Sequence, residues 1–207
     1  MDIKKTTQMK AQQHWSCVVF CICLWPVFFA STADAQEIWE SRKGYVRSQA
    51  NLAPGLMKNQ SRVNAYIAGD MDIYFDDQFS FSGSAWYSFS TIRSGQTGVT
   101  MNHAIFWGGA YHWAQPGRLD PYVMIQPGFG VARSAYLNHG ELSQSAVSVV
   151  PLISASAGFN YYVGSMFHFL FRVQAVSGHV TSNMPTPISL NEVRCSVGLG
   201  YNFRLFK

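Results

Sequence analysis

Residues 193–205 read VRCSVGLGYNFRL, and this stretch decides the fold class of the chain. Its side chains alternate between an apolar row and a row of polar or small residues, which is the period of a β-strand. The apolar row comprises Val193, Cys195, Val197, Leu199, Tyr201, Phe203 and Leu205; the other row comprises Arg194, Ser196, Gly198, Gly200, Asn202 and Arg204. The strand is longer than most strands of globular sheets. Because the apolar row carries no charge before Lys207, we expect it to face the hydrocarbon of a bilayer.

The same alternation recurs upstream in segments that are separated by turn residues. These segments span residues 63–75, 79–89, 101–113, 122–135, 153–163 and 167–178, with Leu170 and Val176 as apolar exceptions in the polar row of the last one. The strands of a soluble β-sandwich also alternate, so the choice between a sandwich and a membrane barrel depends on which row carries the bulky side chains. One row is small and rich in Ser and Gly, which suits a cramped barrel interior, while the large aromatic row suits lipid.

Loop lengths assign the two ends of the predicted barrel. The connections at 76–78, 116–120 and 164–166 are short, and those near 91–100, 138–148 and 182–189 are long and polar. Short turns lie on the periplasmic side of bacterial barrels, and single-chain barrels have an even number of strands. We therefore expect an additional first strand between about Ile38 and Gln49, followed by an outer loop around residues 51–60. The predicted fold is an all-β, eight-stranded, antiparallel up-and-down transmembrane β-barrel.

An export signal precedes the alternating segments. Lys4, Lys5 and Lys10 form a basic start, residues 15–30 are apolar, and Ala33-Asp34-Ala35 gives an Ala-x-Ala cleavage site. The apolar run is shorter than the roughly 20 residues that a spanning helix needs, which argues against a membrane anchor. The sequence thus predicts a cleaved signal peptide at 1–35 and a barrel domain at 36–207.

The composition of the predicted mature chain narrows its function. Of the 15 basic and 11 acidic residues, three and two lie within residues 1–35, which leaves 12 and 9 and a net charge of +3. This charge is too mild to indicate nucleic-acid binding. Cys17, Cys21 and Cys23 lie in the signal, so Cys195 alone remains and no disulfide can form within one mature chain.

The Ala-x-Ala signal, the alternating hairpins and the last strand with Ser196, Gly198, Tyr201 and Phe203 together resemble the small bacterial outer-membrane β-barrel family. The resemblance implies an outer-membrane location and contact with outer-membrane lipid and lipopolysaccharide. It also implies that the barrel-assembly machinery recognises the aromatic residues of the last strand during biogenesis. The oligomeric state does not follow from it.

An eight-stranded barrel has an interior only wide enough for its own side chains. The inward rows place ten polar or aromatic residues there: Tyr66, Asp70, Asp72, Tyr74, Trp86, Gln126, Arg172, Gln174, Glu192 and Arg194. Buried charges must find partners, so we predict that Asp70, Asp72 and Arg172 form a structural network and not a transport path. A steady channel is not expected.

Candidate chemistry is sparse. No cluster of His and Cys has metal-ligand spacing and no Gly-rich phosphate loop follows a strand, so we predict no catalytic, cofactor-binding or metal-binding residues. His103 and His112 lie on opposite faces of one strand, and His139 lies in a predicted outer loop.

One pair of residues faintly resembles a site of the lipid A deacylases, which use a His-x-Ser pair on the outer wall of the barrel. His179 and Thr181 share the lipid-facing row, with Ser182 and Asn183 following, and His could act there as a base. Glu192, the nearest acid, falls on the inside by parity, so the third partner is missing.

The sequence therefore favours a non-enzymatic outer-membrane protein with a structural or surface-interaction role through its long loops. Two alternatives remain: a lipid A-modifying hydrolase at His179, and a soluble exported barrel that binds a small ligand. A soluble carrier would place its large apolar residues inward.

Overall fold

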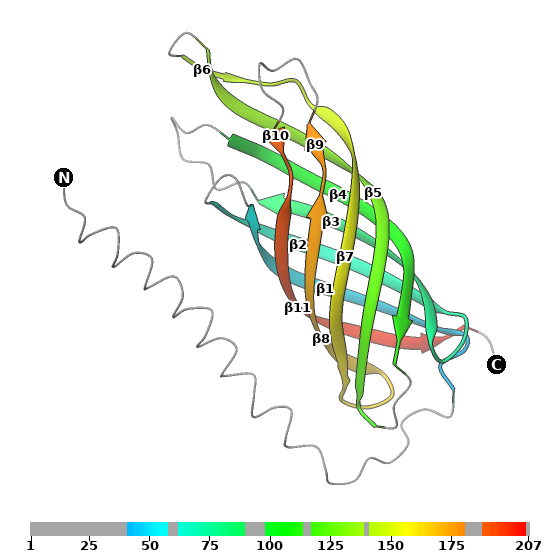
Figure 1. Ribbon diagram of the computed structural model, residues 1–207. Helices are drawn as coiled ribbons and strands as arrows, with labels where there is room; N and C mark the ends of the chain where they lie inside the picture. The colour runs from blue at the N-terminus through cyan, green and yellow to red at the C-terminus, as the bar shows by residue number, and fades with distance from the viewer. Residues whose placement is uncertain are drawn as a thin grey trace, which may run out of the picture. The chain divides into compact units, whose positions relative to one another are not determined.

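The computed structural model describes residues 41–57, 62–89, 98–113, 117–138, 141–180 and 188–205 (Figure 1). Its strands are β1 (Tyr45–Met57), β2 (Arg62–Tyr74), β3 (Phe79–Phe89), β4 (Gly98–His112), β5 (Leu119–Asn138), β6 (Glu141–Gln144), β7 (Ser148–Tyr162), β8 (Phe167–Ser177), β9 (His179–Val180), β10 (Ile188–Ser189) and β11 (Glu192–Arg204). Within these residues no helix is long and apolar enough to span a membrane. The predicted signal peptide lies outside the described residues.

Eight long strands close into a barrel. Each strand of the set β1, β2, β3, β4, β5, β7, β8 and β11 pairs antiparallel with its neighbour along the chain, and β1 pairs with β11. The closing pair runs in one register from Tyr45 opposite Arg204 to Met57 opposite Glu192. Closure leaves no free edge in the eight-stranded wall, which a bilayer requires because lipid cannot satisfy backbone groups. The predicted eight-stranded antiparallel barrel is confirmed.

The outer surface of the barrel carries the bulky apolar row. In β11, Val197 and Leu199 are 53% and 51% exposed, whereas Ser196 is fully buried. The same division holds on the other long strands, so aromatic and branched side chains cover the outside and polar side chains fill the inside. Arg204 is the exception in its row: it is exposed at the end of β11, where it donates to the carbonyl of Ser41 at 3.1 Å.

The first strand corrects the predicted boundaries. It spans Tyr45–Met57, so the prediction of a strand over 38–49 with a loop over 51–60 was wrong in both limits, although residues 38–40 lie outside the described part. Alternation continues to Met57, with Leu52 exposed and Asn51 buried. Pro54 has no amide hydrogen, and it has a register partner on β2 but none on β11. The rule of short and long connections placed an outer loop here, but pairing with β2 and β11 holds the chain extended to Met57.

Four other predicted loops also contain strand residues. β4 begins at Gly98, within the predicted loop 91–100. β5 begins at Leu119, which places Asp120 in a strand and not in the predicted turn at 116–120. β6 lies within the predicted loop 138–148 because β5 extends past β7 and pairs with β6 from Ala135 to Asn138. β10 lies within 182–189 and pairs with β9. β6 thus extends the sheet of the barrel wall, whereas β9 and β10 form a separate two-stranded sheet.

The two ends of the barrel differ. We call one the short-turn end, where Asp76 closes the β2–β3 turn by accepting from the backbone N–H groups of Gln78 and Phe79, both at 2.7 Å. The other is the long-loop end, which carries β6, β9 and β10. In Figure 1, β6 lies at the upper end of the view and the C-terminal end of β11 at the opposite end.

Neighbouring glycines on β4 provide a test of the tight inner wall. A Cβ at Gly108 would collide with the backbone of Ile125 and Gln126, whereas one at Gly109 would meet nothing within 4 Å. We expect Gly108→Ala to lower the free energy of unfolding by about 1–3 kcal/mol, because the β5 backbone would have to move. Gly109→Ala, the matched control, should stay within about 0.5 kcal/mol of wild type. Urea unfolding in detergent micelles measures both; equal effects would contradict the packing described here.

Candidate functional site in the barrel interior

All ten residues predicted to fill the lumen are buried. Their exposed fractions are 4% or less: Tyr66, Asp70, Asp72, Tyr74, Trp86, Gln126, Arg172, Gln174, Glu192 and Arg194. The buried charged side chains of the described residues comprise four arginines and four carboxylates, so the interior is electrically balanced. Since an unpaired buried charge is costly, this balance is typical of a packed network.

The middle of the lumen holds the predicted pair of Asp70 and Arg172. Arg172 Nη2 lies 3.0 Å from Asp70 Oδ2, and Asn51 Nδ2 donates to the same oxygen. The Arg172 guanidinium also lies 5.2 Å from the centre of the Trp86 ring. Asp72, the third predicted member, pairs instead with Arg47 of β1 at 2.7 Å. The predicted link between Asp70 and Arg172 is therefore present, and Asp72 has a partner, Arg47, that the weak pattern of the first strand did not reveal.

A second ion pair lies toward the long-loop end. Glu192 Oε2 accepts from Arg194 Nε at 2.9 Å and from the Tyr66 hydroxyl at 2.6 Å. The Arg194 guanidinium lies 4.1 Å from the centre of the Tyr66 ring and 4.8 Å from that of Trp86, within the range of cation–π attraction. The Glu192 carboxylate is thus already paired inside the barrel.

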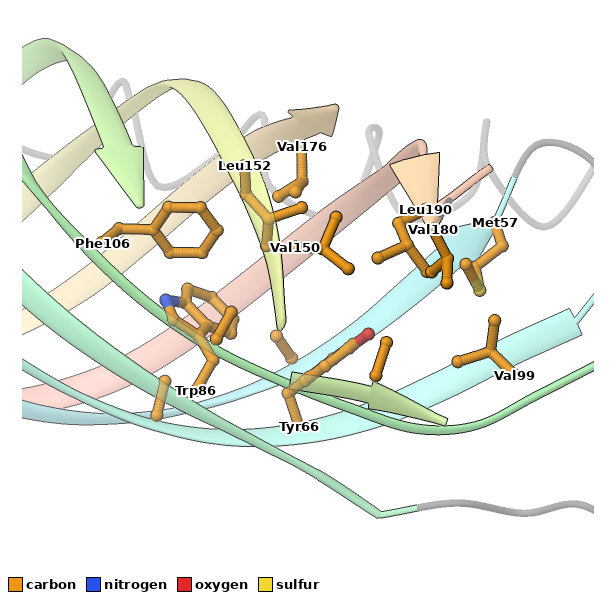
Figure 2. Close-up of a cluster of buried hydrophobic side chains, with 14 residues drawn as sticks. Met57, Tyr66, Trp86, Val99, Phe106, Val150, Leu152, Val176, Val180 and Leu190 are labelled. Carbon is orange, nitrogen blue, oxygen red and sulfur yellow. The ribbon is translucent and has the colours of Figure 1, made fainter. Parts of the chain in front are cut away.

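An apolar cluster fills the lumen beyond these charges (Figure 2). Its larger members include Met57, Val99, Phe106, Val150, Leu152, Val176, Val180 and Leu190. The sequence did not predict this cluster, although Val176 broke the polar row and was a sign of it. Leu170, the other exception, packs in a smaller inner cluster with Ala110, Tyr122 and Met124. The interior is therefore packed with both polar and apolar side chains.

The short-turn end holds the most connected group of the interior, the carboxylate of Asp120. It is fully buried and accepts hydrogen bonds from five strands or segments: Arg42 at 2.7 Å, His112 at 3.0 Å, and Arg47, Tyr74, Asn160 and Tyr162 at 3.2 Å each. Sequence reasoning missed this group because Asp120 was assigned to a turn. Its parity with Gln126, an inward residue of the same strand, was the available signal.

Ser80, His112 and Asp120 lie in the order of an acyl-transfer relay. Ser80 Oγ is 2.9 Å from His112 Nε2, and His112 Nδ1 is 3.0 Å from Asp120 Oδ1. A nucleophile must meet its substrate, however, and Ser80 is only 3% exposed. Asp120 is also shared with two arginines, which already neutralise its charge. In this structure Ser80 Oγ is therefore closed to a substrate from solvent.

Labelling with a fluorophosphonate probe tests this interpretation. We expect no label on the folded protein, because the probe cannot reach Ser80 Oγ. The Ser80→Ala variant, compared in parallel, distinguishes labelling at this site from background. A label that the wild type carries and Ser80→Ala loses would show an accessible nucleophile.

The histidines singled out in the sequence do not converge. His112 is buried inside, whereas His103 lies on the outer face, where its ring stacks on Tyr87 at 4.4 Å between centres. The predicted opposite faces are therefore confirmed. His179 is exposed on β9, on the other side of the wall from Glu192; Thr181 and His139 lie outside the described residues. Among the described residues, no group of three or more His, Cys, Asp or Glu could hold a metal ion.

The closed eight-stranded wall is the feature that this chain shares with proteins of known structure. No protein-family model matches the chain, and no curated protein matches it in sequence. Among solved structures, the N-terminal β-barrel domain of Pseudomonas aeruginosa OprF matches with a TM-score of 0.55 at 15% identity, over 78% of this chain and 98% of that one. The chain has the fold of the eight-stranded outer-membrane β-barrels.

Two further structures share this outer-membrane barrel fold. The attachment invasion locus protein Ail of Yersinia pestis matches with a TM-score of 0.53 at 12% identity, over 78% of this chain and 99% of that one. Neisserial surface protein A matches with a TM-score of 0.56 at 14% identity, over 77% and 96%. At these identities the similarity establishes the fold.

Proposed function

We propose that this chain is an exported, non-enzymatic protein of the bacterial outer membrane that acts through its long-loop end. The observation that carries the proposal is the distribution of side chains: bulky apolar residues cover the outside of a closed wall, while ion pairs and an apolar cluster fill the inside. The outer surface suits acyl chains. A soluble ligand carrier would have the opposite distribution.

The long-loop end is the surface that the proposal assigns to contact with partners. There β5 and β6 extend the wall past the last pair of β5 with β7, and β9 pairs with β10. Two of the similar structures belong to proteins named for attachment and invasion and for the cell surface. Lipopolysaccharide around the barrel and the assembly machinery during biogenesis complete the proposed set of partners.

Location and orientation are tested together by cysteine labelling. In a Cys195→Ala background, Ser143→Cys on β6 should react with a membrane-impermeant maleimide on intact cells, because β6 belongs to the long-loop end. Gln78→Cys in the exposed β2–β3 turn is the matched control and should react only after lysis. Reversed labelling would reverse the orientation. The protein should also fractionate with the outer membrane and migrate faster on gels before heating; a soluble, heat-insensitive form would contradict the proposal.

The packed interior predicts that the barrel does not conduct ions. We expect the purified protein to give no large, stable conductance steps in planar bilayers, since side chains fill the width of an eight-stranded lumen. Steady steps at the single-molecule level would show a continuous path.

The absence of lipid hydrolysis is likewise part of the proposal. Lipopolysaccharide incubated with the purified protein should keep its acyl chains, because Glu192 is bound to Tyr66 and Arg194 inside the wall and cannot support His179. Deacylation by the wild type that His179→Ala abolishes would instead establish the hydrolase.

A further inference from the structure

The mouth of the barrel at the short-turn end is occupied by a side chain from outside the wall. Arg42 precedes β1, and its guanidinium enters the lumen, where Nη1 lies 2.7 Å from Asp120 Oδ1 and 3.4 Å from the carbonyl oxygen of Asp77. The Arg42 residue is 8% exposed and Asp120 is fully buried. The contact is therefore a buried ion pair between the N-terminal segment and the wall.

The charges at the mouth show why a cation is needed at this position. Asp72 takes the Nε and Nη2 groups of Arg47 at 2.8 and 2.7 Å, and only the third nitrogen of Arg47 reaches Asp120, at 3.2 Å. His112 bridges the two sides of the site, with Nδ1 at 3.0 Å from Asp120 Oδ1 and Nε2 at 2.9 Å from Ser80 Oγ. Without Arg42, two carboxylates would share one arginine in a buried site, which is unfavourable.

The segment that carries Arg42 is tied to neighbouring elements by hydrogen bonds. Its backbone N–H donates to Asp77 Oδ1 at 2.6 Å, and Ser41 Oγ donates to the same oxygen at 3.1 Å. A tight turn follows, in which Tyr45 N–H donates to the Arg42 carbonyl at 3.0 Å and Gly44 adopts a φ of 77°, a conformation that favours glycine. We call residues 41–44 the strap. It lies ahead of the strand ladder. Besides the contacts of Arg42 and Asp77, the strap is held by Gly44 N–H, which donates to the Tyr74 carbonyl at 3.1 Å, and by its own carbonyls, which accept from Leu205 N–H and Arg204.

We propose that the mouth at the short-turn end is a guanidinium-binding site, and that Arg42 of the strap is its intramolecular ligand. Arg42 Nη1 meets both acceptors, Asp120 Oδ1 on β5 and the Asp77 carbonyl in the β2–β3 turn, and the site is buried. A guanidinium suits a buried ion pair because it is more weakly hydrated than an ammonium group. An ammonium group presents a compact charge with a different geometry. A polypeptide that presents an arginine at this mouth would compete with the strap for the same acceptors. The inference does not depend on the proposed surface role.

Chemical rescue of a cavity variant tests the proposal. Arg42→Gly removes the guanidinium and should lower the temperature at which the folded, fast-migrating form is lost on gels. Methylguanidinium should bind the vacated mouth and restore most of that loss in a saturable manner, because a ligand that binds only the folded state stabilises it. Methylammonium at the same concentrations should restore much less. Equal rescue by the two cations would overturn the guanidinium assignment, as would no rescue by either.

Controls separate binding at the mouth from general effects of the salts. Methylguanidinium should not stabilise the wild type, whose site is filled, and it should not stabilise Arg42→Gly combined with Asp120→Asn. If the double variant fails to fold, the comparison of wild type with Arg42→Gly still decides. Arg42→Lys should recover only part of the stability that Arg42→Gly loses. An Arg42→Gly protein as stable as wild type would also overturn the proposal.

Discussion

Asp120→Asn is expected to lower the free energy of unfolding by about 3–5 kcal/mol, the magnitude typical of removing one member of a buried ion pair. The amide keeps one acceptor oxygen but replaces the other with a donor, which would face the donors that now converge on the carboxylate. Arg42 would then lack its ionic partner, and Arg47 would keep only Asp72. Urea unfolding of the refolded protein in lipid vesicles, followed by the gel shift, measures the loss.

Glu141→Gln provides the matched control for this change. It is the same acid-to-amide substitution, but Glu141 is exposed on β6. Its effect should stay within about 0.5 kcal/mol, as for most surface substitutions. If the two variants were equally stable, the Asp120 carboxylate would contribute no net stability to the barrel.

Leu199→Arg should destabilise the barrel in a bilayer by about 2–4 kcal/mol, which is the range for arginine at the midplane of the lipid-facing surface. Leu199 lies near the middle of β11, opposite Ala50 of β1 and Phe169 of β8, and its side chain is 51% exposed. The substitution would expose a guanidinium to acyl chains and not to the lumen. Equilibrium unfolding in vesicles measures the change.

A position nearer the membrane interface provides the control, because the destabilisation by a lipid-facing arginine falls to about 0–1 kcal/mol there. Val193 lies in the same outer row of β11, nearer the long-loop end, with 50% exposure. Val193→Arg should therefore cost clearly less than Leu199→Arg. A Leu199→Arg variant that is stable in vesicles would mean that this face does not meet hydrocarbon, and the membrane assignment of the whole outer row would be wrong.

The interior contains two kinds of packing, one made of polar contacts and one of apolar contacts. At the short-turn end, Asp120 collects donors from several strands and fixes the strap to the wall. Toward the long-loop end, the cluster around Phe106 and Leu152 fills the space with apolar side chains, which need no partner. The first kind selects one arrangement of strands because each donor has a specific acceptor. The second tolerates more variation, since apolar contacts have no direction.

The sequence by itself determined the fold class and the outer surface. In β11, successive side chains point to opposite faces, so the alternation of Val197, Gly198 and Leu199 assigns each of them without knowledge of any other strand. The bulk of one row and the short turns then indicated a membrane barrel and its two ends. The first strand was less clear, because its alternation is poor and a loop was expected where the chain continues as strand to Met57.

Only the tertiary structure decided which interior groups meet. Arg47 and Asp72 are 25 residues apart in sequence, and Arg42 and Asp120 are 78 apart. Alternation along a strand decides whether a side chain points inside or outside. The register between strands sets its height in the barrel and therefore its partner. Arg42 lies outside every strand, so alternation does not predict the direction of its side chain. Closure of the wall brings Asp120, its acceptor, to this position. Local alternation thus fixes the direction of a side chain, while its ionic partner depends on the closed barrel.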